Sequence, residues 1–314
     1  MKIALHNLEP EVINTAMMQI SQFHKQKGDS VEWYSALFHH SYNKIYCSSI
    51  FDFSNKDSVT SDMVCGGTGF IGFEEDFNVL TRLPPEIEKC DLDYSLYSNC
   101  HVSFLWFSRG CINNCPFCIV PKLEGKIHSV IPKKLNSNGK VIYVMDPNFF
   151  ANPKYPETIR LLIELGQPVD FQQGIDARIF TPEHGEALDL LQIHKQVRTA
   201  WDNPKDDLTK QFKLMMQFIP KSKIMVYVLI GYWSTPQEDL ERVMKIRELG
   251  LDAYVMPYNK QDPYQKAFTR WNNRHVGCEW EDYDRTEFER LKRQNGNQDP
   301  LDFLKISSFC GSQG

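Results

Sequence analysis

Three cysteines close together are the residues whose types and spacing point most directly to chemistry. Cys111, Cys115 and Cys118 fall within eight positions, separated first by three residues and then by two. Thiolates are soft ligands that select zinc or iron–sulfur clusters, and such short spacing lets one loop wrap one face of a metal centre. A closed zinc site or an ordinary four-iron ferredoxin site needs a fourth cysteine or a histidine, and none follows at a typical spacing. The loop therefore predicts a metal centre with one coordination position left for a ligand that is not protein.

The cysteine loop resembles the signature of the radical S-adenosylmethionine superfamily, in which three cysteines with this spacing hold a [4Fe–4S] cluster. Phe117 stands at the aromatic position just before the last cysteine of that signature. The resemblance implies that the open iron binds the amino and carboxylate groups of S-adenosyl-L-methionine (SAM), and that reduction releases a 5′-deoxyadenosyl radical. It also implies an oxygen-sensitive enzyme that receives electrons from a reductant such as flavodoxin or ferredoxin.

Two interpretations from other classes remain open. The protein can be an iron–sulfur redox carrier or sensor without SAM chemistry, or the loop can be a zinc knot in a binding module. Methylthiotransferases of the superfamily hold an additional cluster with three cysteines of the N-terminal domain, and four cysteines precede the loop here: Cys47, Cys65, Cys90 and Cys100. Only Cys47 falls where one of those ligands would, so we interpret these four as scattered thiols of a hydrophobic core.

Length and composition predict a globular protein of the cytoplasm. The chain has 314 residues, of which 42% are hydrophobic and 12% aromatic, and a net charge of −5. No apolar run approaches the ~20 residues of a membrane span, and the first residues lack the features of a secretory signal. Nine cysteines, an odd number with a tight cluster among them, favour reduced thiols over disulfides. The acidic balance provides no global attraction to the phosphates of a nucleic acid.

Residues 1–100 are expected to form a small Rossmann-like α/β domain. A helix is expected to start near Pro10 and to end at Gly28. The expected strands are 2–5, 31–35 and 44–50. This order resembles the cobalamin-binding-like domain of one branch of the superfamily. Its cobalt-ligating Asp-x-His-x-x-Gly signature is missing after the first strand, where the chain reads His6-Asn7-Leu8-Glu9-Pro10, so we expect no cobalamin.

A glycine-rich stretch in the same domain invites comparison with phosphate-binding loops. Gly66-Gly67-Thr68-Gly69 neither follows a clear strand nor opens a clear helix, as a phosphate-binding loop must. We therefore interpret it as an ordinary loop.

From residue 101 a strand-then-helix order repeats, which implies parallel strands joined by crossover helices. The expected strands are 102–107, 141–145, 169–173, 197–201, 223–230 and 253–256. Six such units over residues 101–260 fit the partial (β/α)6 TIM-like barrel that the superfamily uses. Residues 261–314 are expected to form a helical C-terminal extension, with one helix beginning at Asp262 and another capped by Thr286 and Glu289.

Polar side chains at the carboxyl ends of these strands are the candidates for cofactor binding, because those ends share one face of a barrel. The superfamily's Gly-Gly-Glu-like segment, which contacts the SAM amino group, corresponds to Asp146 and Asn148, although its glycines are absent here. Arg178 offers a planar guanidinium for a carboxylate, whereas strand alternation leaves the direction of Arg198 open. The predicted cofactor-binding residues are Phe117, Asp146, Asn148, Gln173, Asp176, Arg178, Arg198, Asp202 and Gly231, and the predicted cluster ligands are Cys111, Cys115 and Cys118. The sequence identifies neither a catalytic residue nor the substrate, which can be a nucleic acid, a peptide or a small molecule.

Overall fold

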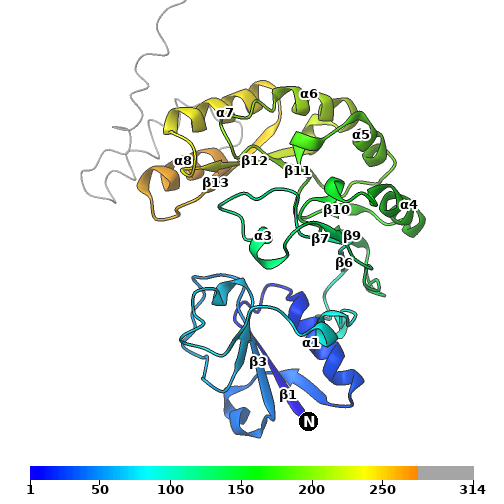
Figure 1. The fold of residues 1–314 in the computed structure, drawn as a ribbon, viewed down its shortest axis with the longest axis vertical. Coiled ribbons are helices and arrows are strands. Elements are labelled where there is room, and N and C mark those ends of the chain that lie inside the picture. The colour runs from blue at the N-terminus through cyan, green and yellow to red at the C-terminus, as the bar shows by residue number, and fades with distance from the viewer. Residues whose placement is uncertain (275–314) are drawn as a thin grey trace, which may run out of the picture. The chain divides into compact units, whose positions relative to one another are not determined.

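The computed structural model describes residues 1–274 of the chain. The chain folds into two compact units, which we describe one at a time (Figure 1). Among the described residues, the first unit comprises residues 1–106, 122–125 and 130–142, and the second comprises residues 107–121, 126–129 and 143–274. The predicted helix with Thr286 and Glu289 lies outside the described residues.

The first unit is built on a parallel sheet with the strand order β2-β1-β3-β4-β5. Its elements are β1 (Lys2–Asn7), α1 (Thr15–Gln26), β2 (Ser30–Trp33), β3 (Lys44–Ser48), β4 (Val64–Gly66), β5 (Val79–Leu80) and α2 (Pro85–Glu88). Successive residues of β1 enter different buried clusters: Leu5 packs with Met17 of α1, and Ala4 packs with Cys47 and Cys65. Because side chains alternate along a strand, these clusters cover opposite faces of the sheet. The α/β prediction is confirmed for this unit.

Helix α1 begins later than the sequence predicted. Its N-cap is Asn14 rather than a residue near Pro10, and the Asn14 side chain accepts a hydrogen bond from the Met17 N–H (3.2 Å). Asparagine suits this place because its oxygen satisfies an N–H that has no partner within the helix. The helix ends at Gln26, close to the predicted end at Gly28, whose φ of 80° interrupts right-handed helix.

The loops that follow β3 and β4 pack against each other backbone to backbone. Ser49 N–H donates to the Gly66 carbonyl (3.1 Å), and Gly69 N–H donates to the Ser49 carbonyl (2.9 Å). A Cβ atom at Gly67 would lie 2.3 Å from the Ser49 oxygen, and one at Gly69 would lie 2.4 Å from the Phe51 oxygen. The glycines of this stretch therefore serve close packing between two loops, which agrees with the prediction of an ordinary loop.

Within residues 102–274, strands alternate with helices from residue 141 onward. The elements are β6 (Val102–Leu105), β7 (Ser108–Arg109), α3 (Val120–Leu123), β8 (His128–Ser129), β9 (Val141–Val144), α4 (Tyr155–Leu165), β10 (Val169–Phe171), α5 (Pro182–Asp189), β11 (Val197–Ala200), α6 (Thr209–Phe218), β12 (Ile224–Ile230), α7 (Pro236–Glu248), β13 (Asp252–Pro257) and α8 (Pro263–Arg274). All six predicted strands are confirmed, each within two residues at either end. In Figure 1, helices α4 to α7 form an arc outside the strands of the second unit.

The six strands form two three-stranded sheets, in the orders β10-β9-β6 and β11-β12-β13. Strands β11, β12 and β13 are parallel. Between the two sheets, a backbone bond from Ile175 N–H to the Arg198 carbonyl (2.8 Å) links the residues after β10 to β11. The predicted α/β order is thus present, whereas one continuous barrel sheet is not observed in the described part of the chain.

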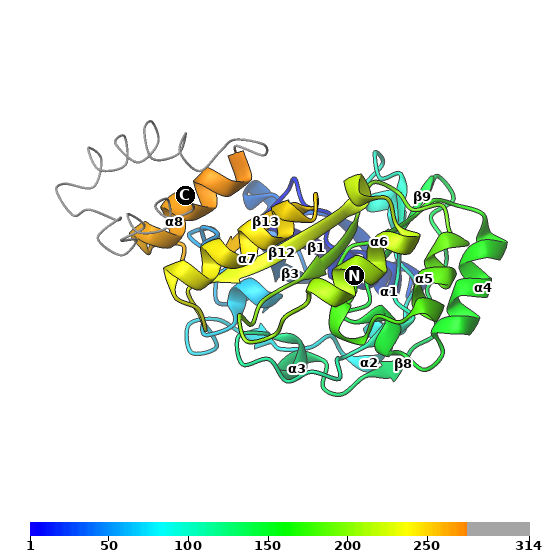
Figure 2. The ribbon, with the colours of Figure 1, turned by 90° about the horizontal axis from the view of Figure 1, so that it is seen from above.

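Strand β13 lies at the edge of its sheet, and helix α8 covers its free side (Figure 2). The Asn273 side chain accepts from Val255 N–H and donates to the Val255 carbonyl, both at 2.9 Å. Asn272 donates to the Ala253 carbonyl (2.6 Å). These two amides satisfy backbone groups that no neighbouring strand of the described chain pairs.

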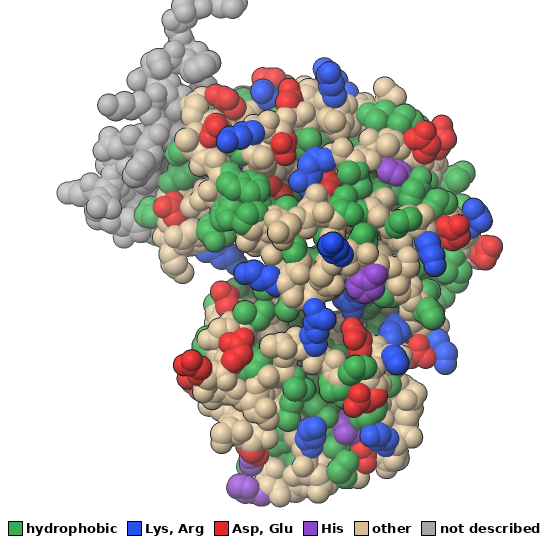
Figure 3. All heavy atoms as spheres, viewed as in Figure 1, with side chains coloured by type: hydrophobic (Ala, Val, Ile, Leu, Met, Phe, Trp, Pro, Cys, Tyr) green, Lys and Arg blue, Asp and Glu red, His purple; other side chains and the backbone are tan. Residues whose placement is uncertain are grey.

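The surface carries charges of both signs. On the face drawn in Figure 3, acidic and basic side chains occur on each of the two units, and hydrophobic side chains reach the surface of both. Among residues 1–274, no helix combines the length and the apolar character that crossing a membrane requires.

Candidate functional site

A cavity of about 230 Å³ in the second unit has all three cysteines of the loop in its wall. The rest of the wall comes from the carboxyl ends of β9, β10 and β11 and from residues of β12 and the loop beyond it. The predicted residues that line it are Cys111, Cys115, Phe117, Cys118, Asn148, Gln173, Asp176, Arg178 and Asp202. Polar groups at the strand ends thus lie beside the cysteine loop in this wall, as expected.

The three thiols are each half-buried, and none forms a disulfide within the described chain. Cys111 Sγ accepts hydrogen bonds from Asn113 N–H (3.4 Å) and from Asn148 Nδ2 (3.7 Å). Burial raises the pKa of Cys115, and the adjacent guanidinium of Arg178 opposes this rise.

The three thiols lie along one cavity wall, and none of them forms a disulfide within the described chain. Thiols are the soft donors that bind zinc or iron–sulfur clusters. Within residues 1–274, no three His, Cys, Asp or Glu side chains are gathered closely enough to hold one metal ion.

The Asp176 carboxylate forms hydrogen bonds that connect the cysteine loop to residues after β9 and β10. It accepts from Arg178 Nε (2.8 Å) and a terminal nitrogen (2.9 Å), from Asn113 Nδ2 (2.8 Å) and from Asn148 Nδ2 (3.2 Å). Burial alone would raise the pKa of Asp176, but the hydrogen bonds and charge of Arg178 outweigh it, and the pKa is lowered. Arg178 is correspondingly held protonated, since its hydrogen bonds to Asp176 raise its pKa. Both carboxylate oxygens are engaged, so Asp176 orients its neighbours rather than offering a free acceptor.

Two buried polar atoms in the wall have no hydrogen-bond partner among the described residues. They are Asn148 Oδ1 and Thr199 Oγ1, on residues that are only 3% and 2% exposed. Leaving a buried polar atom unsatisfied costs about 1–3 kcal/mol, so such atoms are usually paired. Both atoms therefore point to a ligand with polar groups in this cavity.

Acidic side chains outnumber basic side chains in the wall. It contains the carboxyl groups of Asp176, Asp202 and Asp206 and, among the described residues, one guanidinium, that of Arg178. Burial raises the pKa of Asp202, and the charges of Arg178 and Arg242 oppose this rise. A cavity of this composition favours a ligand that carries positive charge.

Aromatic rings close one side of the cavity. The Phe117 ring packs edge-to-face against Trp233, with centroids 5.3 Å apart, and against Tyr232 at 5.5 Å. Trp233 and Tyr227 both line the cavity, and neither was predicted. The wall residues that sequence reasoning missed include Asn113, Thr199, Asn203, Asp206, Tyr227 and Trp233. Position would have identified three of these six, since Asn113 lies between two of the cysteines, and Asn203 and Trp233 each lie three residues beyond a strand end.

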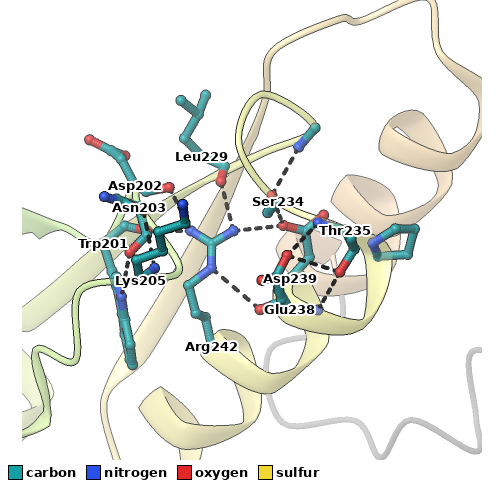
Figure 4. A network of polar contacts seen from close by, with 12 residues as sticks. Trp201, Asp202, Asn203, Lys205, Leu229, Ser234, Thr235, Glu238, Asp239 and Arg242 are labelled. Carbon is teal, nitrogen blue, oxygen red and sulfur yellow. Dashed lines mark hydrogen bonds and ion pairs between the residues drawn. The ribbon is translucent and has the colours of Figure 1, made fainter.

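A buried arginine beneath the site holds two of its loops (Figure 4). Arg242 of α7 donates to the carbonyls of Trp201 (2.6 Å) and Asp202 (3.0 Å) after β11, and to that of Leu229 (2.9 Å) in β12. It also pairs with Asp239 (2.6 Å), whose carboxylate accepts from Tyr264 (2.9 Å) and from Ser234. Arg242 thus fixes the backbone at Asp202, a residue of the cavity wall.

Two predicted residues lie outside the cavity wall. Arg198 turns toward β10 and pairs with the buried carboxylate of Asp170 (2.5 Å). Gly231 has a φ of 75°, and the side chain of Gln265 occupies the space where a Cβ would be, so this glycine is required by local packing. Neither residue is placed to contact a ligand in this cavity.

Asp146 also lies outside the wall, and it supports the start of the cysteine loop instead. It is 1% exposed, and its carboxylate accepts from Phe107 N–H (2.9 Å) and from the Ser108 hydroxyl (2.5 Å). Burial raises the pKa of Asp146 from 3.8 to about 6, although these hydrogen bonds oppose the rise.

This raised pKa predicts a pH dependence of stability. The folded state binds the Asp146 proton more tightly than the unfolded state does. The contribution of Asp146 to the free energy of unfolding is therefore full below about pH 4, and it falls by about 3 kcal/mol as the pH rises to about 6. Asp146→Asn should remove this fall, measured as the free energy of unfolding in urea at several pH values. The exposed Asp189→Asn variant should retain the wild-type profile, and an unchanged profile in Asp146→Asn would contradict the prediction.

Comparison with known proteins finds low similarity to methylthiotransferases. No model of a protein family matches the chain. The chain is 23% identical over 200 residues to the ribosomal protein uS12 methylthiotransferase RimO of Clostridioides difficile (strain 630), which covers 52% of this chain and 45% of that protein. It is 20% identical over 192 residues to RimO of Clostridium botulinum (strain Eklund 17B / Type B), covering 51% and 43%. The chain thus spans less than half the length of these curated relatives. Because methylthiotransferases occur in the superfamily that the cysteine loop resembles, the similarity supports that resemblance.

Proposed function

We propose that this protein is a radical SAM enzyme that holds one [4Fe–4S] cluster on Cys111, Cys115 and Cys118 at the mouth of an open partial (β/α)6 barrel. The observation that carries the proposal is that these thiols share one acidic cavity wall with the unsatisfied atom Asn148 Oδ1. SAM carries a positive charge at its sulfonium, and such a wall matches that charge. When bound, the cluster and SAM supply reductive cleavage of the sulfonium and a radical that abstracts hydrogen from a substrate.

The residues of the wall have different roles in binding SAM. Asn148 Oδ1 is placed to accept an N–H of the SAM amino group, and Asp176 orients Asn148, Asn113 and Arg178 around it. Asp202 and Asp206 supply negative charge, and the ring of Phe117 with Trp233 offers an apolar surface for adenine. A reductant such as flavodoxin or ferredoxin supplies the electron.

Methylthiotransfer is a second candidate, favoured by the names of the two similar proteins. The first unit offers little support for the additional cluster that this reaction uses. Cys47 and Cys65 are buried opposite each other on β3 and β4, at 2% and 1% exposure, and no cysteine stands directly after β1, where the chain reads Leu8-Glu9-Pro10. We therefore propose a single cluster, and the substrate class remains a nucleic acid, a peptide or a small molecule.

The test is anaerobic reconstitution followed by iron and sulfide analysis. We expect about four irons and four sulfides per chain, and release of 5′-deoxyadenosine when dithionite and SAM are added. About eight irons would favour methylthiotransfer. A cluster whose spectrum SAM leaves unchanged would favour a redox or sensor protein, and colourless protein with bound zinc would favour a zinc knot.

The unsatisfied amide of the wall gives a sharper test of SAM binding. Asn148→Leu should weaken SAM binding to the reconstituted protein by about ten-fold, since one hydrogen bond to the SAM amino group is lost. Equilibrium dialysis with labelled SAM measures this change. Asn114→Ala serves as the control, because Asn114 is exposed in the same loop and does not line the cavity. Equal SAM affinities of the two variants would show that Asn148 does not contact SAM.

A further inference from the structure

The first unit has a topological switch point between β1 and β3. In the strand order β2-β1-β3-β4-β5, β2 lies on one side of β1 and β3 lies on the other, so the direction of strand addition reverses at β1. In open parallel sheets, ligands bind in the crevice outside the carboxyl ends of the strands at such a point. Strand β1 ends here at Asn7 and β3 at Ser48.

The side chain of Glu9 occupies this place. Its carboxylate accepts from Ile50 N–H (3.0 Å) and Phe51 N–H (3.3 Å), and from the hydroxyls of Ser49 (2.9 Å) and Ser54 (2.5 Å). Burial alone would raise the pKa of Glu9, but these four hydrogen bonds outweigh it, and the pKa is lowered. Glu9 therefore sits in this loop as an anion.

The four donors are held in place from their other side as well. Thr68 donates its hydroxyl hydrogen to the Ile50 carbonyl (2.6 Å), and the glycines at 67 and 69 pack tightly on Ser49 and Phe51. Consecutive backbone N–H groups that converge on one point form an anion-binding nest, a common way to hold phosphate. Two such groups and two hydroxyls are the donors that a phosphate oxygen would need.

We propose that the switch point of the first unit is an oxyanion site which the chain fills with its own Glu9 carboxylate, and that the external ligand it matches is a phosphate group. The site is therefore closed to phosphate in the wild-type protein and opens when the carboxylate is removed. This proposal does not depend on the cluster or on SAM, because all its residues lie in the first unit.

The test compares Glu9→Ala with wild type in inorganic phosphate and in chloride of equal ionic strength. Glu9→Ala should melt at a temperature that rises saturably with phosphate and should bind it at least about ten-fold more tightly than wild type by calorimetry. Glu11→Ala is the matched control, because Glu11 is an exposed acid two residues further on. It should behave as wild type does.

Two further results decide the outcome if Glu9→Ala is poorly folded. Its refolding yield should then be higher in phosphate than in chloride. Glu9→Gln keeps the volume of the side chain, so it should be less stable than wild type and should gain no phosphate affinity. The proposal is overturned if phosphate neither stabilises nor rescues Glu9→Ala, or if Glu11→Ala responds to phosphate equally well.

Discussion

Replacing Cys115 with alanine is expected to abolish formation of 5′-deoxyadenosine. The three thiols are the only cysteines that residues 1–274 place in the cavity wall, and a cluster that loses one of three protein ligands leaves a second iron open to solvent. Product should fall at least about 10³-fold, to the level of a reaction without protein, because the radical chemistry belongs to the cofactor pair. Chromatography of anaerobic reactions with dithionite and SAM measures the product.

The control for this prediction is Cys90→Ala. Cys90 is also a half-buried free thiol, but it lies in the first unit and outside the cavity wall. This variant should retain the iron content and the activity of wild type. Full activity in Cys115→Ala, or equal losses in both variants, would show that the loop is not the cluster site.

Replacing Arg242 with methionine should lower the free energy of unfolding by about 3–5 kcal/mol, the usual cost of breaking a buried ion pair on one side. Arg242 and Asp239 are 2% and 0% exposed, and the substitution leaves the Asp239 carboxylate without its cation and four backbone carbonyls without their Arg242 donor (Figure 4). Denaturant unfolding followed by circular dichroism measures this change.

A double variant separates the unpaired charge from the lost packing. Arg242→Met combined with Asp239→Leu removes both charges, so it should recover part of the stability lost by Arg242→Met alone. Arg242→Met should also weaken SAM binding, because the backbone of Asp202 loses its support. A single variant within about 1 kcal/mol of wild type would show that the network contributes little to the fold.

The cavity wall could be predicted where local pattern determines position. The cysteines can be recognised from their spacing alone. Asn148, Gln173 and Asp202 can be placed at strand ends because each follows a hydrophobic run of strand length. Asp146 and Asn148 show where this reasoning stops. They are two residues apart, yet Asp146 holds the start of the cysteine loop by hydrogen bonds whereas Asn148 lines the cavity.

Interactions between distant residues determine what the sequence left open. The direction of Arg198 depends on Asp170, a residue 28 positions away, and the role of Arg242 depends on the Trp201 carbonyl, 41 positions away. Asp239 and Arg242 are spaced as neighbours on one helix turn, but the sequence does not show that this turn is buried. The early start expected for α1 has a local cause, since Asn14 is a better N-cap than any residue near Pro10.

The amides of Asn272 and Asn273 have a consequence for how the protein behaves at high concentration. An uncovered edge strand recruits strands from other molecules, which is the first step of aggregation into fibres. With Ala253 and Val255 already bonded to α8, strand β13 has few groups left for such recruitment. Truncations that remove α8 should therefore make the protein more prone to precipitate through this strand.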